Sequence, residues 1–149
     1  YLPALEGAPS KQGVSYIYYE GDFQSTSQMT QSEPAGKGTM PALSIREAPR
    51  EDHFGYEFRT WINIPERGVY RFYTFSDDGS RLLIDGHEVV DNDGSGSPRR
   101  KDGKIALEAG WHELKVLYFE SYMGQVLEVG FSSKEIRETT LSENMLFVP

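Results

Sequence analysis

The sequence contains no cysteine among its 149 residues. Disulfide bonds are therefore excluded, and the three histidines (His53, His87 and His112) do not share the spacing of metal ligands, so no zinc site is expected. No apolar run approaches the roughly 18 residues of a membrane-spanning helix. No segment keeps a 3.6-residue apolar period either, so long amphipathic helices are not expected.

Positive charge is also scarce, with 15 Lys and Arg side chains against 23 Asp and Glu and a formal net charge of −8. Such a field repels polyphosphates and anionic lipid surfaces, so nucleic acid is excluded as a partner and membrane insertion is not expected. A neutral ligand or a cation remains compatible with this charge.

Catalytic motifs are missing as well. The chain has no Ser-His-Asp order, no glycine-rich phosphate loop and no metalloprotease motif. Glycosidases need two carboxylates, but the abundance of Asp and Glu here does not by itself form a catalytic pair. The sequence therefore predicts a protein without enzymatic activity.

Short strand-like segments are what the sequence does contain. Aromatic residues make up 13% of the chain, and β-branched and aromatic runs recur between turn signals every eight to twelve residues. This pattern predicts an all-β fold, an antiparallel β-sandwich or barrel. The expected strands lie within residues 13–23, 53–65, 69–75, 81–92, 104–120 and 125–131.

The segments between and around these strands suggest the domain limits. Residues 1–12 contain Pro and Gly and are interpreted as a linker, with one domain over 13–149. Residues 24–50 and 92–103 are polar and are expected to be long surface loops. Asp85-Gly86 predicts a hairpin turn, and the tail residues 145–147 are expected to dock on an edge of the fold.

A family resemblance rests on three quoted runs. SYIYYEGDF (15–23), GVYRFYTFSDDGSRLLIDGHEVVDNDG (68–94) and LEAGWHELKVLYFE (107–120) closely resemble the protective-antigen fourteen-kilodalton domain, in the family's order and spacing. The resemblance covers about residues 13–149. It implies a jelly-roll-like β-sandwich or barrel of the kind found in toxins, glycosidases and yeast adhesins. The closing LSENMLFVP resembles versions attached to bacterial glycoside hydrolases.

Asp77 and Asp78 form the first candidate site. Two adjacent carboxylates repel each other, and a divalent cation such as Ca²⁺, which prefers oxygen ligands, would relieve that repulsion. The resemblance implies the same role, because in the adhesin branch the matching Asp-Asp pair holds calcium through a cis peptide and the calcium touches sugar hydroxyls. The alternative is a solvated turn at Gly79 whose carboxylates cap backbone amides.

Glu120 stands where the resemblance places an Asn that helps to hold calcium. It is therefore a candidate calcium ligand, and an ion pair with Arg81 is the alternative. Tyr122 and Met123 lie where the family has its second ligand loop, and Trp111 is a candidate sugar platform or a packing residue. Residues 91–102 match a calcium-binding loop only weakly and are interpreted as an ordinary hairpin loop.

The sequence thus predicts a non-catalytic carbohydrate-binding accessory module of a secreted glycoside hydrolase, dependent on calcium. Its ligand-binding residues would be Asp77, Asp78, Trp111, Glu120 and Tyr122, and its partners a glycan and an adjacent catalytic domain. The expected location is extracellular, periplasmic or at the cell surface. The alternative is a structural accessory domain that shapes the pocket of a catalytic neighbour and binds no sugar itself.

Overall fold

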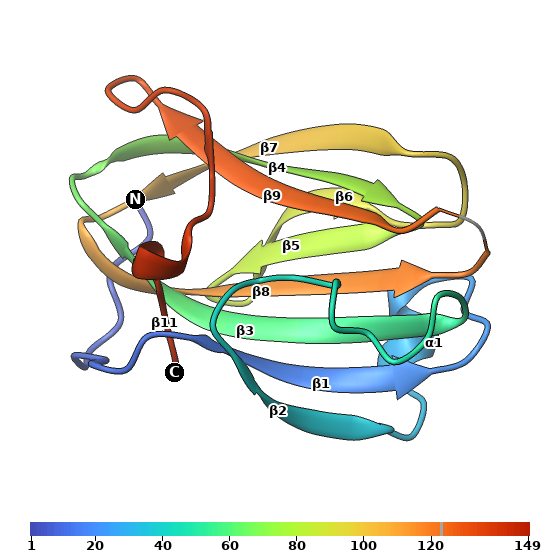
Figure 1. The fold of residues 1–149 in the computed structure, drawn as a ribbon. Helices are drawn as coiled ribbons and strands as arrows, with labels where there is room; N and C mark the ends of the chain where they lie inside the picture. The colour runs from blue at the N-terminus through green and yellow to red at the C-terminus, as the bar shows by residue number, and fades with distance from the viewer. Residues whose placement is uncertain (123) are drawn as a thin grey trace.

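The computed structural model describes residues 1–122 and 124–149, so Met123 of the predicted second ligand loop lies outside the described residues. Two antiparallel sheets pack face to face, which confirms the all-β prediction and selects a sandwich rather than a closed barrel among the described strands (Figure 1). The elements are β1 (Val14–Glu20), α1 (Thr26–Thr30), β2 (Gly36–Met40), β3 (Phe54–Ile64), β4 (Gly68–Asp77), β5 (Ser80–Ile84), β6 (His87–Asn92), β7 (Arg99–Leu107), β8 (Gly110–Glu120), β9 (Val126–Ser133), β10 (Thr139–Thr140), the 3₁₀ turn η1 (Glu143–Met145) and β11 (Leu146–Phe147).

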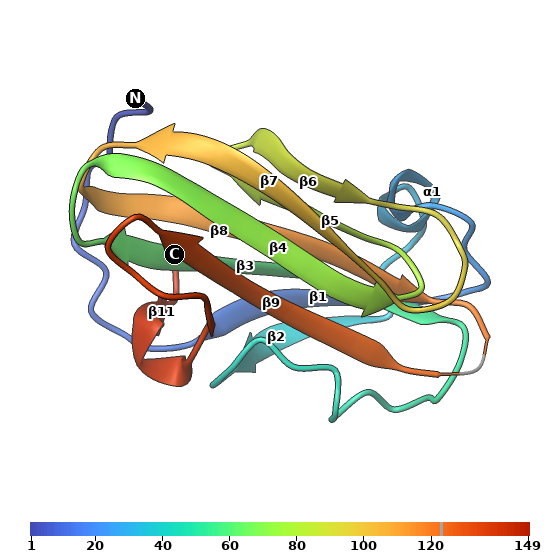
Figure 2. The same cartoon turned by 90° about the horizontal axis from the view of Figure 1, so that it is seen from above.

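The larger sheet has the strand order β2-β1-β3-β8-β5-β6, with β11 paired to β3, and the smaller sheet has the order β10-β9-β4-β7. Consecutive strands therefore change sheets repeatedly, as in a jelly roll. Two of these crossings matter for function. The chain passes from β4 to β5 and from β8 to β9 at the same end of the sandwich (Figure 2).

The core is built by the period-two alternation of the strands. In β3 the residues of one face are all buried: Phe54, Tyr56, Phe58, Thr60 and Ile62. The same alternation in β8 turns Leu114, Val116 and Tyr118 into the core. The next inward position of β8 is its last residue, Glu120, so regular alternation carries a carboxylate into the interior.

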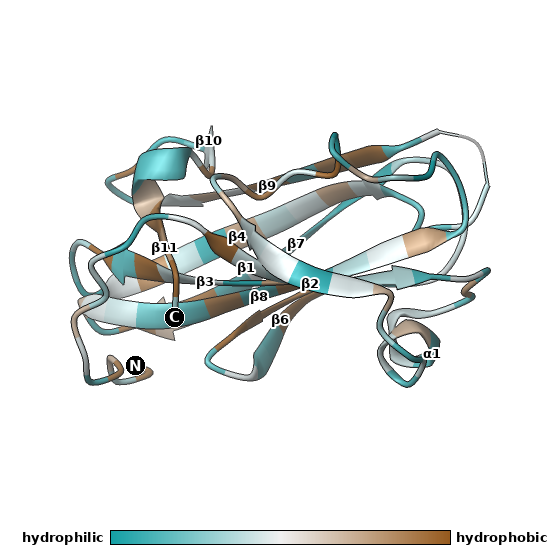
Figure 3. Ribbon diagram, turned by 60° about the horizontal axis from the view of Figure 1, so that its bottom comes forward, coloured by the Kyte–Doolittle hydropathy of each residue, from teal (hydrophilic) through white to brown (hydrophobic). Residues whose placement is uncertain are grey.

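The two long edges of the sandwich differ in how tightly the sheets meet. At the β6/β7 edge a Cβ on Gly103 would lie 1.8 Å from the carbonyl oxygen of Val89, so only glycine allows the strands to approach so closely. At the opposite edge, the segment that follows β2 runs beside the start of β9 and leaves a groove. Figure 3 shows this start of β9 as an apolar stretch.

Two loop predictions were wrong in part. Residues 24–50 contain α1 and β2, and β2 pairs with β1 although its Gly-Lys-Gly-Thr sequence lacks both alternation and strand propensity. An edge strand of this kind is held by backbone hydrogen bonds to its neighbour. Residues 92–103 include the start of β7, so the loop is shorter than predicted. Since β6 and β7 belong to different sheets, this loop is a crossing and not a hairpin.

The amino-terminal segment predicted as a linker packs on the sandwich. The amide of Leu2 donates to the carbonyl of Ala106 (2.8 Å), and the amide of Leu5 donates to that of Trp111 (2.8 Å). The predicted docking of the tail is confirmed, because Leu146 is buried and β11 pairs with β3. Both termini lie at the end opposite the β4–β5 crossing (Figure 1). None of the described helices has the length and apolar character needed to cross a membrane.

Candidate functional site

The crossing from β4 to β5 is fixed against the end of β8. The amide of Asp78 donates to the carbonyl of Phe119 (3.1 Å), and the amide of Phe119 donates to the carbonyl of Gly79 (3.0 Å). A Cβ on Gly79 would lie 2.5 Å from the Phe119 ring and 2.8 Å from the Gly94 backbone. Glycine is therefore required for this close approach, which sets Asp77 and Asp78 beside Glu120.

The structure brings three of the predicted site residues together. One carboxylate oxygen from each of Asp77, Asp78 and Glu120 lies within 4.8 Å of the others, and we call these residues the acidic cluster. All three are buried, with exposed fractions of 6%, 4% and 0%. The predicted alternative is therefore wrong in making the turn solvated, although Asp78 does accept hydrogen bonds from backbone amides as that alternative expected. The peptide bond between Asp77 and Asp78 is cis.

Asp78 is held by backbone donors from two loops. Its Oδ1 accepts from the amide of Gly96 (2.9 Å), and its Oδ2 accepts from the amide of Ser121 (2.6 Å). Asp77 has a different neighbour, since a Cβ on Gly124 would lie 2.8 Å from its Oδ2. Of the described residues that follow β8, Ser121 therefore binds the acidic cluster through its amide and Gly124 lies against Asp77.

Glu120 lacks such support. Both of its carboxylate oxygens are buried, and no described residue gives either a hydrogen-bond donor while all three carboxyls are ionised. Burial first, then a shared proton with Asp78 and repulsion by Asp78 and Asp77, raise the pKa of Glu120 to about 9. Burial and repulsion by Asp78 also raise the pKa of Asp77, and the positive charge of Arg99 partly offsets this. The acidic cluster therefore requires either a proton or a cation.

The donor set suits a hard divalent cation. Calcium takes about six to eight oxygen ligands, and carboxylates are among the commonest. Glu120 could supply such a ligand, because both of its oxygens are buried without a described donor and one of them lies within 4.8 Å of an oxygen of Asp77 and of Asp78. The remaining coordination positions would fall to main-chain oxygens, water or a ligand hydroxyl.

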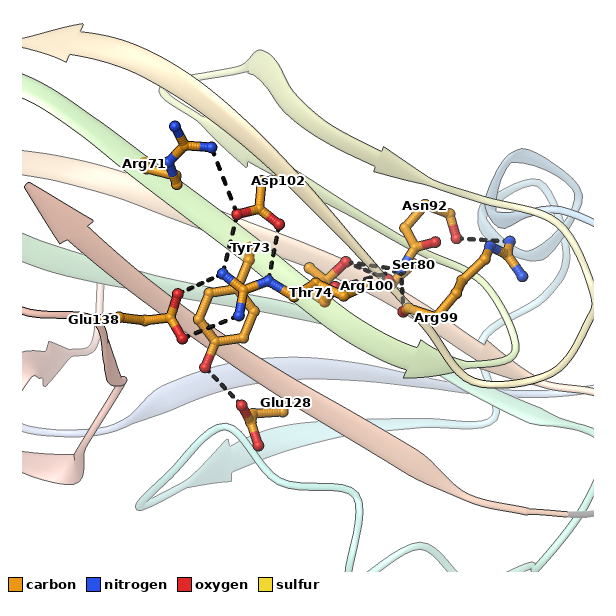
Figure 4. Close-up of polar contacts among 10 residues, drawn as sticks. All are labelled: Arg71, Tyr73, Thr74, Ser80, Asn92, Arg99, Arg100, Asp102, Glu128 and Glu138. Carbon is orange, nitrogen blue, oxygen red and sulfur yellow. Dashed lines mark hydrogen bonds and ion pairs between the residues drawn. The ribbon is translucent and has the colours of Figure 1, made fainter.

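A buried polar network supports the crossing from behind. The Ser76 hydroxyl donates to the carbonyl of Asp78 (3.0 Å) and lies 2.7 Å from the Ser80 hydroxyl, which donates to Thr74 Oγ1 (2.9 Å). Asn92 Nδ2 donates both to Thr74 Oγ1 (3.2 Å) and to the carbonyl of Arg99 (3.0 Å), as Figure 4 shows. Sequence reasoning missed this network. The alternation of β4 could have indicated this network, because it places the polar residues Thr74 and Ser76 at inward positions.

The other predicted site residues do not all lie near the acidic cluster. Tyr122 is 67% exposed, two residues beyond Glu120, and remains beside the acidic cluster. Trp111 is the second residue of β8 and lies roughly 30 Å from Glu120, at the rise of an extended strand. There it contacts Phe147 edge to face, with ring centroids 5.2 Å apart. The predicted alternative pair of Glu120 with Arg81 is wrong, because Arg81 points out of the sheet and binds Glu88 (2.6 Å).

Comparison with known families matches residues 10–143 to the model of the PA14 domain, the protective-antigen fourteen-kilodalton domain. The chain belongs to the PA14 family. This confirms the resemblance of the three sequence runs, and the match covers all three residues of the acidic cluster.

Relatives of this PA14 domain occur in different proteins. It is 32% identical over 141 residues to the anti-sigma-I factor RsgI3 of Acetivibrio thermocellus, covering 91% of the chain and 21% of that protein's length. An anti-sigma factor domain-containing protein from Clostridium clariflavum matches 99% of the chain and 52% of its own, with 22% identity and a TM-score of 0.74. A PA14 sugar-binding domain from an RTX adhesin matches 94% of the chain and 100% of its own, with 14% identity and a TM-score of 0.70.

Proposed function

We propose that this PA14 domain is a non-catalytic carbohydrate-binding module that uses calcium. The observation that carries the proposal is the Glu120 carboxylate, which is buried without a described donor beside Asp77 and Asp78. A chain rarely buries three carboxylates together unless a proton or a metal ion compensates them. The name of the RTX adhesin domain, which has the same fold and is described as sugar-binding, supports the choice of ligand.

Each residue of the proposed site has a separate task. Asp77, Asp78 and Glu120 would hold Ca²⁺, and the two backbone bonds to Asp78 fix one ligand in place. Vicinal hydroxyls of a sugar would complete the coordination shell from the solvent side. Tyr122, which is exposed two residues after Glu120, would offer its ring to the apolar face of the sugar. Trp111 lies too far away to touch the same sugar ring.

The setting of the domain is also a proposal. The prediction of a glycoside hydrolase parent stays untested, and the relative with 32% identity is an anti-sigma factor of which the chain spans about a fifth. We keep the broader proposal that the domain presents a glycan-binding end away from the rest of its parent protein. An extracellular, periplasmic or cell-surface location would give that end access to glycans.

A structural accessory role is the second candidate, and the end that carries the termini favours it. Trp61 and Trp111 lie 6.4 Å apart between ring centroids, with Phe147 against Trp111. Both chain termini lie at this end, so a neighbouring domain could pack on these rings (Figure 1). In that case Trp111 would have a packing role and the acidic cluster would be structural.

Titration of the isolated domain with a sugar panel, with and without a chelator, separates the two candidates. We expect calcium-dependent binding in the millimolar range, about 4 kcal/mol, because one sugar ring offers little area against the entropic cost of association. Amide shifts in NMR spectra should centre on Asp78, Glu120 and Tyr122. Tyr122→Ala should weaken binding with the fold intact.

The matched control for the calcium ligands is a pair of Asp→Asn variants. Asp78→Asn should abolish calcium-dependent binding, whereas Asp91→Asn, on an exposed position of β6, should leave it unchanged. If none of the sugars shifts a residue of the acidic cluster, the carbohydrate proposal fails and the accessory role is preferred. Aryl-glycoside reporters should show no turnover. Turnover that disappears when one carboxylate is replaced would contradict the non-catalytic assignment.

A further inference from the structure

A groove of about 710 Å³ lies along the edge of the sandwich opposite the β6/β7 edge. It lies between residues 40–47, which follow β2, and residues 125–127, where β9 begins, with Glu143 at one side. Its volume falls within the range of about 300–1,000 Å³ that is usual for ligand sites. In Figures 1 and 2 the chain after β2 runs beside β9 toward the end that carries the acidic cluster.

The groove begins close to the acidic cluster, although no residue of the cluster lines it. Gly124 approaches the Asp77 carboxylate so closely that a Cβ there would lie 2.8 Å from Oδ2, and the next residue, Gln125, lines the groove. The β4–β9 register also pairs Asp77 with Val126 and Ser76 with Leu127. The residues that begin the groove are therefore strand partners of the residues at and beside the acidic cluster, which places the two within reach of one extended ligand.

The lining of the groove combines an apolar floor with polar edges. Leu43, Val126 and Leu127 are half-buried and supply the floor. Arg46 and Gln125 are exposed and present donors and an amide oxygen at the edges, and the Gln125 amide also donates to the carbonyl of Glu51. Apolar surface beside a few polar groups is the arrangement that suits sugar rings, which have C–H faces and hydroxyl edges.

We infer that this groove binds the following sugar residues of an oligosaccharide whose terminal sugar lies at the acidic cluster. The inference rests on the proposed function and gives it a ligand class: an extended, uncharged glycan chain rather than a lone monosaccharide. In the groove lining the positive charge of Arg46 stands against the carboxylates of Glu47 and Glu143, so the charge of the groove does not favour an acidic chain.

Chain length is the variable that tests this inference. Galactose-, glucose- and xylose-based series, each from the monosaccharide to the tetrasaccharide, should be titrated in calcium by calorimetry and by NMR. For the series that binds, affinity should rise by at least about tenfold from the monosaccharide to the longest member. The amides of Leu43 and Leu127 should shift only with the longer members, while those at the acidic cluster should shift with all.

A matched pair of variants separates the groove from the acidic cluster. Leu43→Asn should remove the gain with chain length and keep monosaccharide binding, and Leu5→Asn, at the opposite end of the sandwich, should keep both. If a monosaccharide binds and affinity does not rise with chain length, the inference about the groove is overturned, whereas the proposed function stands. Failure of all three series to bind would overturn both, and an unchanged gain in Leu43→Asn would overturn the groove alone.

Discussion

Two clusters of carboxylates in this domain differ in whether the chain itself provides a cation. On the outer face of the smaller sheet, Arg100 binds Asp102 through two hydrogen bonds (2.9 and 3.0 Å) and also binds Glu138 (Figure 4). Its guanidinium lies 3.9 Å from the centre of the Tyr73 ring. The acidic cluster has no such side chain: among the described residues, no Lys or Arg forms an ion pair with it.

The pKa values of the carboxyl groups are shifted in opposite directions in the two clusters. Hydrogen bonds from Arg100 lower the pKa of Asp102 and of Glu138, whereas burial and neighbouring carboxylates raise the pKa of Glu120 to about 9. The outer cluster is already compensated within the folded chain and has no need of a ligand. The difference shows that carboxylates become a credible cation site through the absence of a protein partner and not through their number.

The largest expected effect is the removal of calcium. A ligand that binds only the folded state adds about 2.7 kcal/mol at a hundredfold excess over its dissociation constant. At roughly 2–4 °C per kcal/mol for a domain of this size, chelation should lower the melting temperature by roughly 5–11 °C. Differential scanning calorimetry with calcium and with chelator measures this shift.

The variant Asp102→Asn is the control for this experiment, because it removes a carboxylate from the compensated cluster. It should keep the full calcium response, and Asp77→Asn should lose it. Identical melting curves for the wild-type protein in calcium and in chelator would remove the basis of the comparison, since both clusters would then be independent of added cations.

The next effect concerns Glu120 in the absence of calcium. Because its pKa rises from 4.5 to about 9 on folding, the carboxyl must take up a proton at neutral pH. The stability of the calcium-free protein should therefore fall as the pH rises from 4.5 toward 9. Glu120→Gln should remove this slope and raise stability near neutral pH by roughly 2 kcal/mol, part of the gain being lost because the amide is buried too.

Urea unfolding in chelator at several pH values gives this slope directly. Glu66→Gln, on an exposed loop position, is the control and should leave the slope as it is in the wild type. A wild-type protein whose calcium-free stability rises over the same pH range would mean that Glu120 is ionised and held by another group.

The strands of this domain were predictable from sequence because local alternation dictates them. The pattern over residues 53–65 predicted the strand that became β3, and the SDDG turn marked the acidic pair. The position of Glu120 beside that pair was not derivable from spacing, since it depends on two crossings between sheets, and it came from the family resemblance. Trp111 was placed with the ligand residues because it shares a strand with Glu120, and an extended strand separates the two ends that it joins.

The features that were not predicted from the sequence depend on contacts between residues that are far apart along the chain. β2 has no pattern of its own and exists because β1 offers an edge, and the polar network behind Asp78 joins residues from β4, β5 and β6. The groove is formed by chain segments about 80 residues apart that meet only where the sheets fail to close. Such features arise from packing, so single-sequence periodicity contains no signal for them.

The smallest expected effect comes from the compensated cluster itself. An exposed ion pair is worth about 0–1 kcal/mol, because side-chain entropy and solvent screening offset most of the attraction. Arg100→Gln should therefore lower the melting temperature by at most roughly 4 °C, and high salt should shrink the difference, since screening weakens surface pairs. The calcium response should stay intact in this variant. A double-mutant cycle of Arg100→Gln with Asp102→Asn isolates the pair, and a coupling larger than the whole calcium effect would reverse the ranking of the two clusters.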